Sequence, residues 1–303
     1  MSNAANKKRG YAQKHLLNVL ALLILLVGAA CLAYPTVSNW MLHQAQEQVT
    51  VQQTEAVEKA DPQNLDAEFQ NAQHYNDAVF AGRTVVTDPF DPSQPTTKSD
   101  DYLRILNIAN DGVMGSIHIP KLALSFPLYH GTNEDELTHG VGHLVNTSLP
   151  IGGPSTHCVF AGHTGLPSVK IFDSLDKLSA GDIFIIEVLK EKRAYEIYDT
   201  EIVLPHETDS LTIQPDSDLV TLVTCTPYGV NDHRFLVHAK RCEMPTEQTE
   251  AVTETKTNTS PWMLDLEKPT LIAIGIFVVI IATATAAALI ARRRRTRKDR
   301  HAQ

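Results

Sequence analysis

The stretch Thr221–Cys225 reads Thr-Leu-Val-Thr-Cys, an apolar and β-branched run that ends in a cysteine. Beyond an interval rich in turn-forming residues, Arg234 opens a second apolar run, Phe235–Val237. This pattern predicts two β-strands joined by a loop. If the strands pair as a hairpin, Cys225 and Arg234 lie at the same end of it, each beside the loop. A thiol in that position is a nucleophile with a fixed positive charge where an oxyanion would form.

A catalytic thiol needs a general base, and the chain offers thirteen histidines. The run Val159–His163 reads Val-Phe-Ala-Gly-His, which is another strand pattern with a histidine at its end. Because rigid folds present chemistry at strand ends and in the loops that follow, we expect His163 to be the base. His163 and Cys225 would then form an imidazolium–thiolate pair. Each residue alone has an ordinary structural explanation, but three at strand ends favour catalysis.

These segments resemble the signature of the sortase family of cysteine transpeptidases. Thr221–Cys225 with the downstream Arg234 matches the family's TLxTC pattern, and Ala161–His163 matches its catalytic-histidine segment. The resemblance extends from about Gly112 to Arg241. Further matches, which resemble class C, the pilus-assembling sortases, lie at residues 142–144, 147–150 and 162–167.

The resemblance implies three catalytic residues and two residues of the substrate groove. The catalytic residues are His163, Cys225 and Arg234, and the groove residues are Thr224 and Thr164. Thr164 stands where class C enzymes commonly carry arginine, which puts the local groove contacts in doubt but leaves the catalytic residues intact.

A turn-rich segment at residues 83–101 contains Asp88, Pro89 and Phe90. This Asp-Pro-aromatic sequence resembles the lid that plugs the active site of class C sortases. The resemblance implies that Asp88 lies near Arg234 and that the Phe90 ring covers the thiol. We therefore expect residues 83–101 to form a lid loop.

The remaining pattern predicts an all-β fold for residues 102–242. Many short strand patterns with few helices indicate a closed barrel, and the resemblance implies the eight-stranded sortase barrel with short helices. We expect those helices at residues 133–138 and 171–178. Residues 35–82 are predicted to be a helical stalk or flank, with amphipathic spacing over residues 44–80.

Two charge-free apolar segments, residues 16–34 and 269–291, are long enough to cross a bilayer. Both adjoin basic tails, at residues 1–15 and 292–303, so the positive-inside rule predicts cytoplasmic termini and an extracellular catalytic domain. Residues 243–268 read as a flexible tether to the second span. Cleavage of the first span as a signal peptide, or lipidation at Cys31, is a less favoured alternative.

The charge distribution argues against a nucleic-acid partner. The chain carries a net charge of −9, and removing the two basic tails leaves about −19 between the spans. Such a segment has no contiguous basic surface to face phosphates, so the membrane is the partner expected for the arginine-rich tail.

The cysteines and histidines give no strong metal signature, and we expect neither a metal nor a cofactor. His139 and His143 are four residues apart, but glycines interrupt the helix that would align them, and the chain has no C-x-x-C. Whether Cys158 and Cys242 form a disulfide stays open.

The function implied by the resemblance is that of a membrane-anchored, extracellular transpeptidase. Its substrates would be pilin precursors with an LPxTG-like sorting signal, which it would cleave through a thioacyl intermediate and join by a lysine isopeptide bond. A housekeeping sortase that anchors proteins to the cell wall is one alternative. A non-enzymatic surface ectodomain is the other, although it would not need a cysteine, a histidine and an arginine at strand ends.

Overall fold

The computed structural model describes residues 2–82, 84–91, 98–165 and 170–245, with side chains from residue 17 onward. Contact clustering separates Val37–Thr257, which contains the barrel, from a second unit that includes the N-terminal part of the chain. The predicted second span at 269–291, the basic tail at 292–303 and most of the tether at 243–268 lie outside the described residues.

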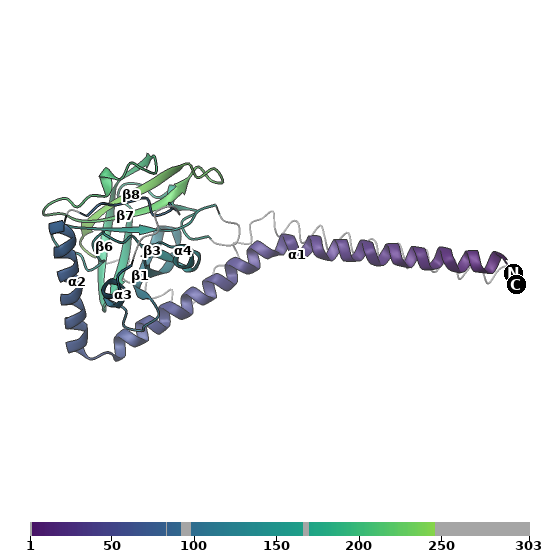
Figure 1. Cartoon of the computed structure of the whole chain (residues 1–303), viewed down its shortest axis with the longest axis horizontal. Helices are drawn as coiled ribbons and strands as arrows, with labels where there is room; N and C mark the ends of the chain where they lie inside the picture. The colour runs from purple at the N-terminus through teal and green to yellow at the C-terminus, as the bar shows by residue number, and fades with distance from the viewer. Residues whose placement is uncertain (1, 83, 92–97, 166–169, 246–303) are drawn as a thin grey trace. The chain divides into compact units, whose positions relative to one another are not determined.

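Eight strands close into a barrel in the order β1-β2-β3-β4-β7-β8-β6-β5 (Figure 1). Neighbouring strands are antiparallel except β2–β3 and β4–β7, which are parallel. The bounds are β1 Val113–Ile119, β2 Leu124–His130, β3 Val141–His143, β4 Thr156–Ala161, β5 Ile183–Val188, β6 Glu191–Val203, β7 Asp218–Thr226 and β8 His233–Cys242. The eight-stranded barrel predicted for residues 102–242 is therefore confirmed.

The side chains on the two faces of β7 pack into two different apolar clusters. Successive side chains of a strand point to opposite faces, and Val220 and Leu222 belong to the main barrel core. Val223 belongs instead to a second apolar cluster, which we call the outer cluster. Its members are Leu144, Val159, Leu211, Val223 and Leu236. Cys225 follows Val223 by two residues, so it shares the face of the outer cluster.

Four α-helices and three short 3-10 helices accompany the barrel. The α-helices are α1 Ser2–Lys59, α2 Pro62–Gly82, α3 Asp100–Arg104 and α4 Glu134–His139. The 3-10 helices are η1 Pro120–Leu122, η2 Leu175–Lys177 and η3 Asp209–Leu211. The short helix predicted at residues 133–138 is thus present, shifted by one residue.

The helical segment predicted for residues 35–82 consists of two helices, because the chain breaks between α1 and α2. Asp61 lies at the break, and its Oδ1 accepts a hydrogen bond from the backbone N–H of Gln63 at 2.8 Å. Pro62 begins α2, where its missing N–H and fixed φ suit a first helical position. The Asp61 carboxylate, which accepts a backbone hydrogen bond, and the proline that follows it therefore begin a new helix at this point.

The predicted helix at residues 171–178 is also wrong, since only η2 forms there. Ile171 and Phe172 are buried in the barrel core. The backbone N–H of Phe172 donates to the carbonyl of His163 at 3.0 Å, which holds this turn-forming segment against the end of β4. Burial of both side chains and this tertiary bond outweigh local helical preference.

Among the described residues, one helix, Leu17–Lys59, is long and apolar enough to cross a membrane. Helix α1 continues beyond residue 34, the predicted end of the span, through Pro35 to Lys59.

Helix α2 packs along the barrel (Figure 1), so residues 62–82 form a flank rather than a stalk. Its buried face consists of Leu65, Ala72, Asn76 and Val79. The Asn76 side chain makes two hydrogen bonds with the backbone of Leu149: Oδ1 accepts from N–H at 2.7 Å, and Nδ2 donates to C=O at 3.2 Å. A single buried amide therefore satisfies both polar groups of one barrel residue.

Replacing Asn76 by alanine should destabilise the fold, because the buried Leu149 N–H loses its partner, while the Leu149 carbonyl still accepts from the Ile151 N–H at 2.8 Å. We expect the free energy of unfolding to fall by about 1–3 kcal/mol. Thermal unfolding of the full chain in detergent, followed by circular dichroism, measures this loss. Asn71→Ala, on the exposed face of the same helix, should change stability by less than about 0.5 kcal/mol. Equal effects of the two variants would contradict the role given to Asn76.

Candidate active site

Strand register brings the three predicted catalytic residues to one edge of the barrel. Cys225 on β7 pairs directly with Arg234 on β8. On the other side of β7, Ala161 of β4 pairs with Val223, and extending that register by two residues places His163 beside Cys225. Adjacent strands lie about 4.8 Å apart. The register therefore assembles a histidine, a thiol and a guanidinium in one row.

Two further bonds fix the end of β4 against β7. The N–H of Gly162 donates to the carbonyl of Val223 at 3.1 Å. The hydroxyl of Thr224 donates to the carbonyl of Gly162 at 2.8 Å. A Cβ at Gly162 would lie 2.6 Å from the Phe172 ring, so a larger residue would displace the segment that carries His163.

The row is largely withdrawn from solvent. Cys225 is 9% exposed, Arg234 is 8% exposed, and the His163 side chain is 16% exposed. Burial strengthens the electrostatic interactions among these groups because little water screens them.

The Arg234 side chain contacts the lid segment and the loop between β7 and β8. Its Nε and Nη2 donate to the two carboxylate oxygens of Asp88 at 2.8 and 2.7 Å, a bidentate pair. Its Nη1 donates to the backbone carbonyls of Asn231 and His233. Burial lowers the pKa of Arg234, but its hydrogen bonds to the Asp88 carboxylate, together with the nearby negative charges, reverse this and raise it overall. Asp88 thus occupies the face of the guanidinium that a substrate would need.

The lid residues form a tight turn over the site. The backbone N–H of Phe90 donates to the Asp88 side-chain Oδ1 at 3.4 Å. The backbone N–H of Asp91 donates to the Asp88 carbonyl oxygen, also at 3.4 Å. Aspartate at the first position and proline at the second suit such a turn, and Pro89 is buried. Residues 92–97 of the predicted lid loop lie outside the described residues.

Phe90 packs on the active-site row and on the outer cluster. Its ring centroid lies 5.2 Å from the Arg234 guanidinium carbon and 5.7 Å from the centroid of the His163 ring. The aromatic side chain thus contacts the base and the cation. Its predicted coverage of the Cys225 thiol stays a prediction.

The closed lid disfavours the thiolate. Burial raises the pKa of the Cys225 thiol, Arg234 opposes this rise, and the Asp88 carboxylate adds to it. The same lid therefore neutralises the cation that would activate the nucleophile and places a negative charge near it.

Glu134 is a neighbour of His163 that the sequence analysis missed. Its Oε2 lies 3.4 Å from His163 Nε2, within reach for attraction to an imidazolium but without hydrogen-bond geometry. Glu134 is the first residue of α4. The helix predicted at residues 133–138 was the sequence signal that could have pointed to this residue. Asp173 is a second missed residue: it accepts a 3.4 Å hydrogen bond from Gly165 N–H, and burial raises its pKa.

The two predicted groove residues are both buried, with Thr224 at 4% and Thr164 at 7% exposure. Because its hydroxyl is bonded to Gly162, Thr224 serves strand pairing in the resting structure. The contribution of either residue to a groove stays a prediction.

The other cysteines and histidines have structural surroundings. Cys158 and Cys242 are both free, so the disulfide left open by the sequence does not form in the structure. His143 bonds to the Tyr102 hydroxyl at 2.8 Å, and burial lowers its pKa to about 3. Within the described ranges, no group of three or more potential ligands could hold a metal ion.

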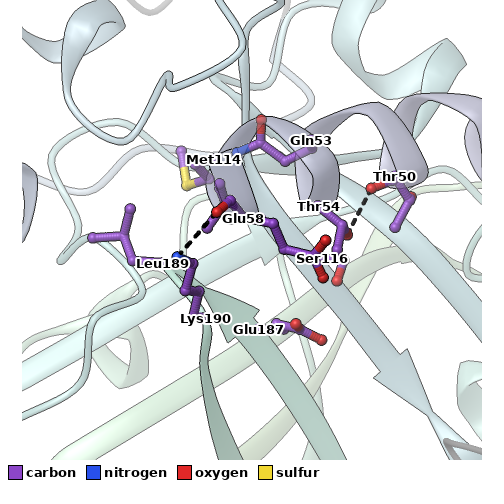
Figure 2. Close-up of a pocket in the computed structure, with 11 residues that line it drawn as sticks. Thr50, Gln53, Thr54, Glu58, Met114, Ser116, Glu187, Leu189 and Lys190 are labelled. Atoms are coloured by element: carbon purple, nitrogen blue, oxygen red, sulfur yellow. Dashed lines mark hydrogen bonds between the residues drawn. The ribbon is translucent and has the colours of Figure 1, made fainter. Parts of the chain in front are cut away.

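A cavity of about 260 Å³ lies elsewhere, between α1 and the barrel (Figure 2). Gln53 and Thr54 of α1 line one side of it, and Met114, Ser116 and Leu189 line the other. None of the catalytic-row residues lines this cavity.

Comparisons with known proteins agree with this geometry. A family model described as the sortase domain matches residues 117–242. The crystal structure of sortase C-1 from Actinomyces oris is 46% identical, with a TM-score of 0.56, and the match covers 59% of this chain and 99% of that one. The chain belongs to the sortase family.

Its similarity to class C sortases extends to other solved structures. Sortase C1 of the GBS pilus island 1 is 36% identical with a TM-score of 0.60, covering 66% of this chain and 94% of that one. Sortase D of Bacillus subtilis (strain 168) is 29% identical over 130 residues, which make up 42% of this chain. The match spans 63% of that curated relative's length.

Replacing Asp88 by alanine, or Asp88 and Phe90 together, should activate the thiol of this sortase. Both changes remove the Asp88 charge that raises the thiol pKa, and loss of the ring reduces burial. The lower thiol pKa increases the thiolate fraction, so alkylation near neutral pH should be several-fold faster than in the unaltered chain. The measurement is the pH dependence of alkylation by a small thiol reagent.

Asp232→Asn is the matched control, since it removes an exposed carboxylate from the β7–β8 loop. Its alkylation profile should follow that of the unaltered chain. If the profile of the double variant also stayed unchanged, residues 88–90 would be a linker rather than a lid.

Proposed function

We propose that this sortase is a membrane-anchored, extracellular transpeptidase that joins pilin subunits. The observation that carries the proposal is the row of His163, Cys225 and Arg234 with the Asp88 carboxylate seated on the guanidinium. A negatively charged plug that matches the arginine so closely indicates that the cation binds a substrate oxygen once the lid opens.

The first half-reaction cleaves a sorting signal of the LPxTG kind. The Cys225 thiolate attacks the carbonyl carbon of the threonine, and the bond from that carbon to the glycine nitrogen breaks. His163, as imidazolium, gives its proton to the departing glycine amine. The product is a thioester between the pilin and Cys225.

The second half-reaction transfers the pilin to a lysine amine. The neutral amine nitrogen attacks the thioester carbonyl, and the Cys225 sulfur leaves as a thiolate. His163 accepts the proton that the amine loses, so the imidazolium–thiolate pair is restored. The new bond is an isopeptide between the threonine carbonyl and the lysine side chain.

Arg234 stabilises both tetrahedral intermediates. Its Nε and Nη2 donors face the lid in the resting structure, and in the open enzyme they are free to bind an oxyanion. A planar guanidinium presents two parallel donors, which a lysine at this position would not reproduce.

The membrane arrangement of the proposal combines α1 with the sequence pattern. Apolar residues from Leu17 onward suit a bilayer span, and the basic residues before them suit the cytoplasmic side. The second span at 269–291, with its basic tail, would return the chain to the cytoplasm. The barrel then lies outside the cell, where sorting signals of secreted pilins are available.

A reconstituted transfer reaction tests the proposal. The full chain in detergent receives a sorting-signal peptide and a lysine-bearing pilin peptide, and mass spectrometry detects the isopeptide product. Cys225→Ala and His163→Ala should each abolish the product with the fold intact, because one removes the nucleophile and the other removes its proton partner.

Cys242→Ala, which removes a half-buried thiol at the end of β8, should retain activity similar to that of the unaltered chain. Full activity in the Cys225 or His163 variant would refute the transpeptidase mechanism. Transfer to a cell-wall peptide amine, with none to the pilin lysine, would instead support the housekeeping alternative.

A further inference from the structure

The backbone of His163 lies just beyond the end of β4. That strand ends at Ala161, and its regular pairing with β7 ends there too. The His163 carbonyl oxygen accepts a hydrogen bond from the backbone N–H of Phe172 at 3.0 Å. The place of the candidate base therefore depends on the segment that contains Phe172. We call residues 170–172 the backing segment.

Helix α1 holds the first residue of the backing segment. The backbone N–H of Lys170 donates to the side-chain Oδ1 of Asn39 at 3.0 Å, between residues 131 positions apart in the chain. Asn39 belongs to the compact unit that begins at Val37 and contains the barrel. The bond is therefore a contact within that unit, and it joins α1 to the segment that binds the His163 carbonyl.

Ring contacts join α1 to the last residue of the backing segment. The His43 ring, one helical turn beyond Asn39, stacks on Phe126 of β2, with ring centroids 6.4 Å apart and planes at 22°. Phe126 in turn meets the Phe172 ring edge-on, also at 6.4 Å. Both phenylalanines are buried, and both spacings lie within the range in which aromatic rings attract each other. Packed rings thus link α1 to Phe172.

A further bond joins α1 to α4. The Gln46 side chain is buried, and its Nε2 donates to the carbonyl oxygen of His139 at 2.9 Å. His139 is the last residue of α4, where backbone carbonyls have no partner within the helix. At the first residue of α4, Glu134 Oε2 lies 3.4 Å from His163 Nε2. Helix α1 therefore also holds the helix that brings a carboxylate to the base.

The α1 side chains that make these contacts lie on one face of the helix. Asn39, His43 and Gln46 follow one another at intervals of four and three residues, which places them on the same side. Gln48, two residues beyond Gln46, is exposed. The two hydrogen bonds have opposite directions, since Asn39 accepts and Gln46 donates. Such bonds set the position of a helix more closely than apolar burial does, because apolar burial is non-directional.

We propose that Asn39 and Gln46 are positioning residues for the active site. Through the backing segment and α4, they keep His163 beside Cys225 in the active-site row. The consequence for turnover rests on the proposed transpeptidase function. The dependence of the bond between Phe172 and His163 on Asn39 does not rest on that function, and it can be measured without substrate.

The opposite directions of the two bonds give a crossed set of variants. Asn39→Asp keeps a side-chain oxygen that can accept from Lys170, whereas Asn39→Leu has a similar volume but no acceptor. Gln46→Met keeps the length of the side chain and removes the donor. Gln48→Met is the matched control, because it makes the same change on the exposed face of α1.

The decisive measurement is hydrogen exchange at the Phe172 amide, followed by NMR of the full chain in detergent micelles. Protection of this amide reports the bond to His163. We expect exchange about fivefold faster in Asn39→Leu than in the unaltered chain, which corresponds to the net loss of one hydrogen bond. Asn39→Asp and Gln48→Met should exchange like the unaltered chain. The Leu222 amide, inside β7, should exchange equally in every protein.

Turnover in the reconstituted transfer reaction measures the effect on the base. A misplaced His163 transfers protons less well but leaves the binding of substrate to the rest of the site in place. We therefore expect kcat to fall about tenfold in Asn39→Leu and in Gln46→Met, with KM within about twofold of the unaltered value. Asn39→Asp and Gln48→Met should keep kcat close to that of the unaltered chain.

Equal exchange of the Phe172 amide in Asn39→Leu and Asn39→Asp would overturn the proposal, and so would equal, measurable kcat in Gln46→Met and Gln48→Met. Faster exchange at Leu222 together with Phe172 would also overturn it, since Asn39 would then stabilise the whole barrel. If no protein formed the isopeptide, the unaltered chain included, while the exchange difference remained, the proposed function would fail. The support that Asn39 gives to the backing segment would stand.

Discussion

The position of β7 between two partners is the constraint on which the rest of the structure depends. Its antiparallel pairing with β8 sets Cys225 opposite Arg234, and its parallel pairing with β4 brings the end of that strand, with His163, alongside. A slip of one residue in either pairing would turn a catalytic side chain to the opposite face. The active site is therefore a product of register rather than of any single loop.

In the resting structure, the contacts made by Cys225 and Arg234 disfavour the chemistry proposed for them. The bidentate contact of Asp88 uses the donors of Arg234 that would bind an oxyanion, and burial raises the pKa of the thiol. In the proposed mechanism, substrate therefore displaces this buried ion pair before the Cys225 thiol becomes reactive. An enzyme of this design is protected from adventitious thiol chemistry until a matching ligand competes for the guanidinium.

Features that depend on the local sequence pattern could be predicted from the sequence. Features that depend on contacts between residues far apart in the chain could not. Strand ends predicted that His163, Cys225 and Arg234 lie together, as the register places them. The resemblance of the Asp-Pro-aromatic sequence predicted the contact of Asp88 with Arg234, while the catalytic and lid roles stay predictions. The helix predicted at 171–178 did not form, because burial of Phe172 and its bond to His163 are tertiary. Glu134 beside His163 was not foreseen, because the approach of helix α4 to the end of β4 is a tertiary contact that one sequence does not display.

The most direct test of the central claim is to isolate the acyl-enzyme. The Asp88→Ala, Phe90→Ala chain is incubated with a sorting-signal peptide, quenched in acid and digested, and the cysteine-containing fragments are weighed by mass spectrometry. The account predicts a thioester at Cys225, lost on treatment with hydroxylamine, together with release of the glycine-led fragment of the peptide. An acyl group on Cys158 or Cys242, or release of that fragment with no adduct when the reaction is sampled during turnover, would contradict it.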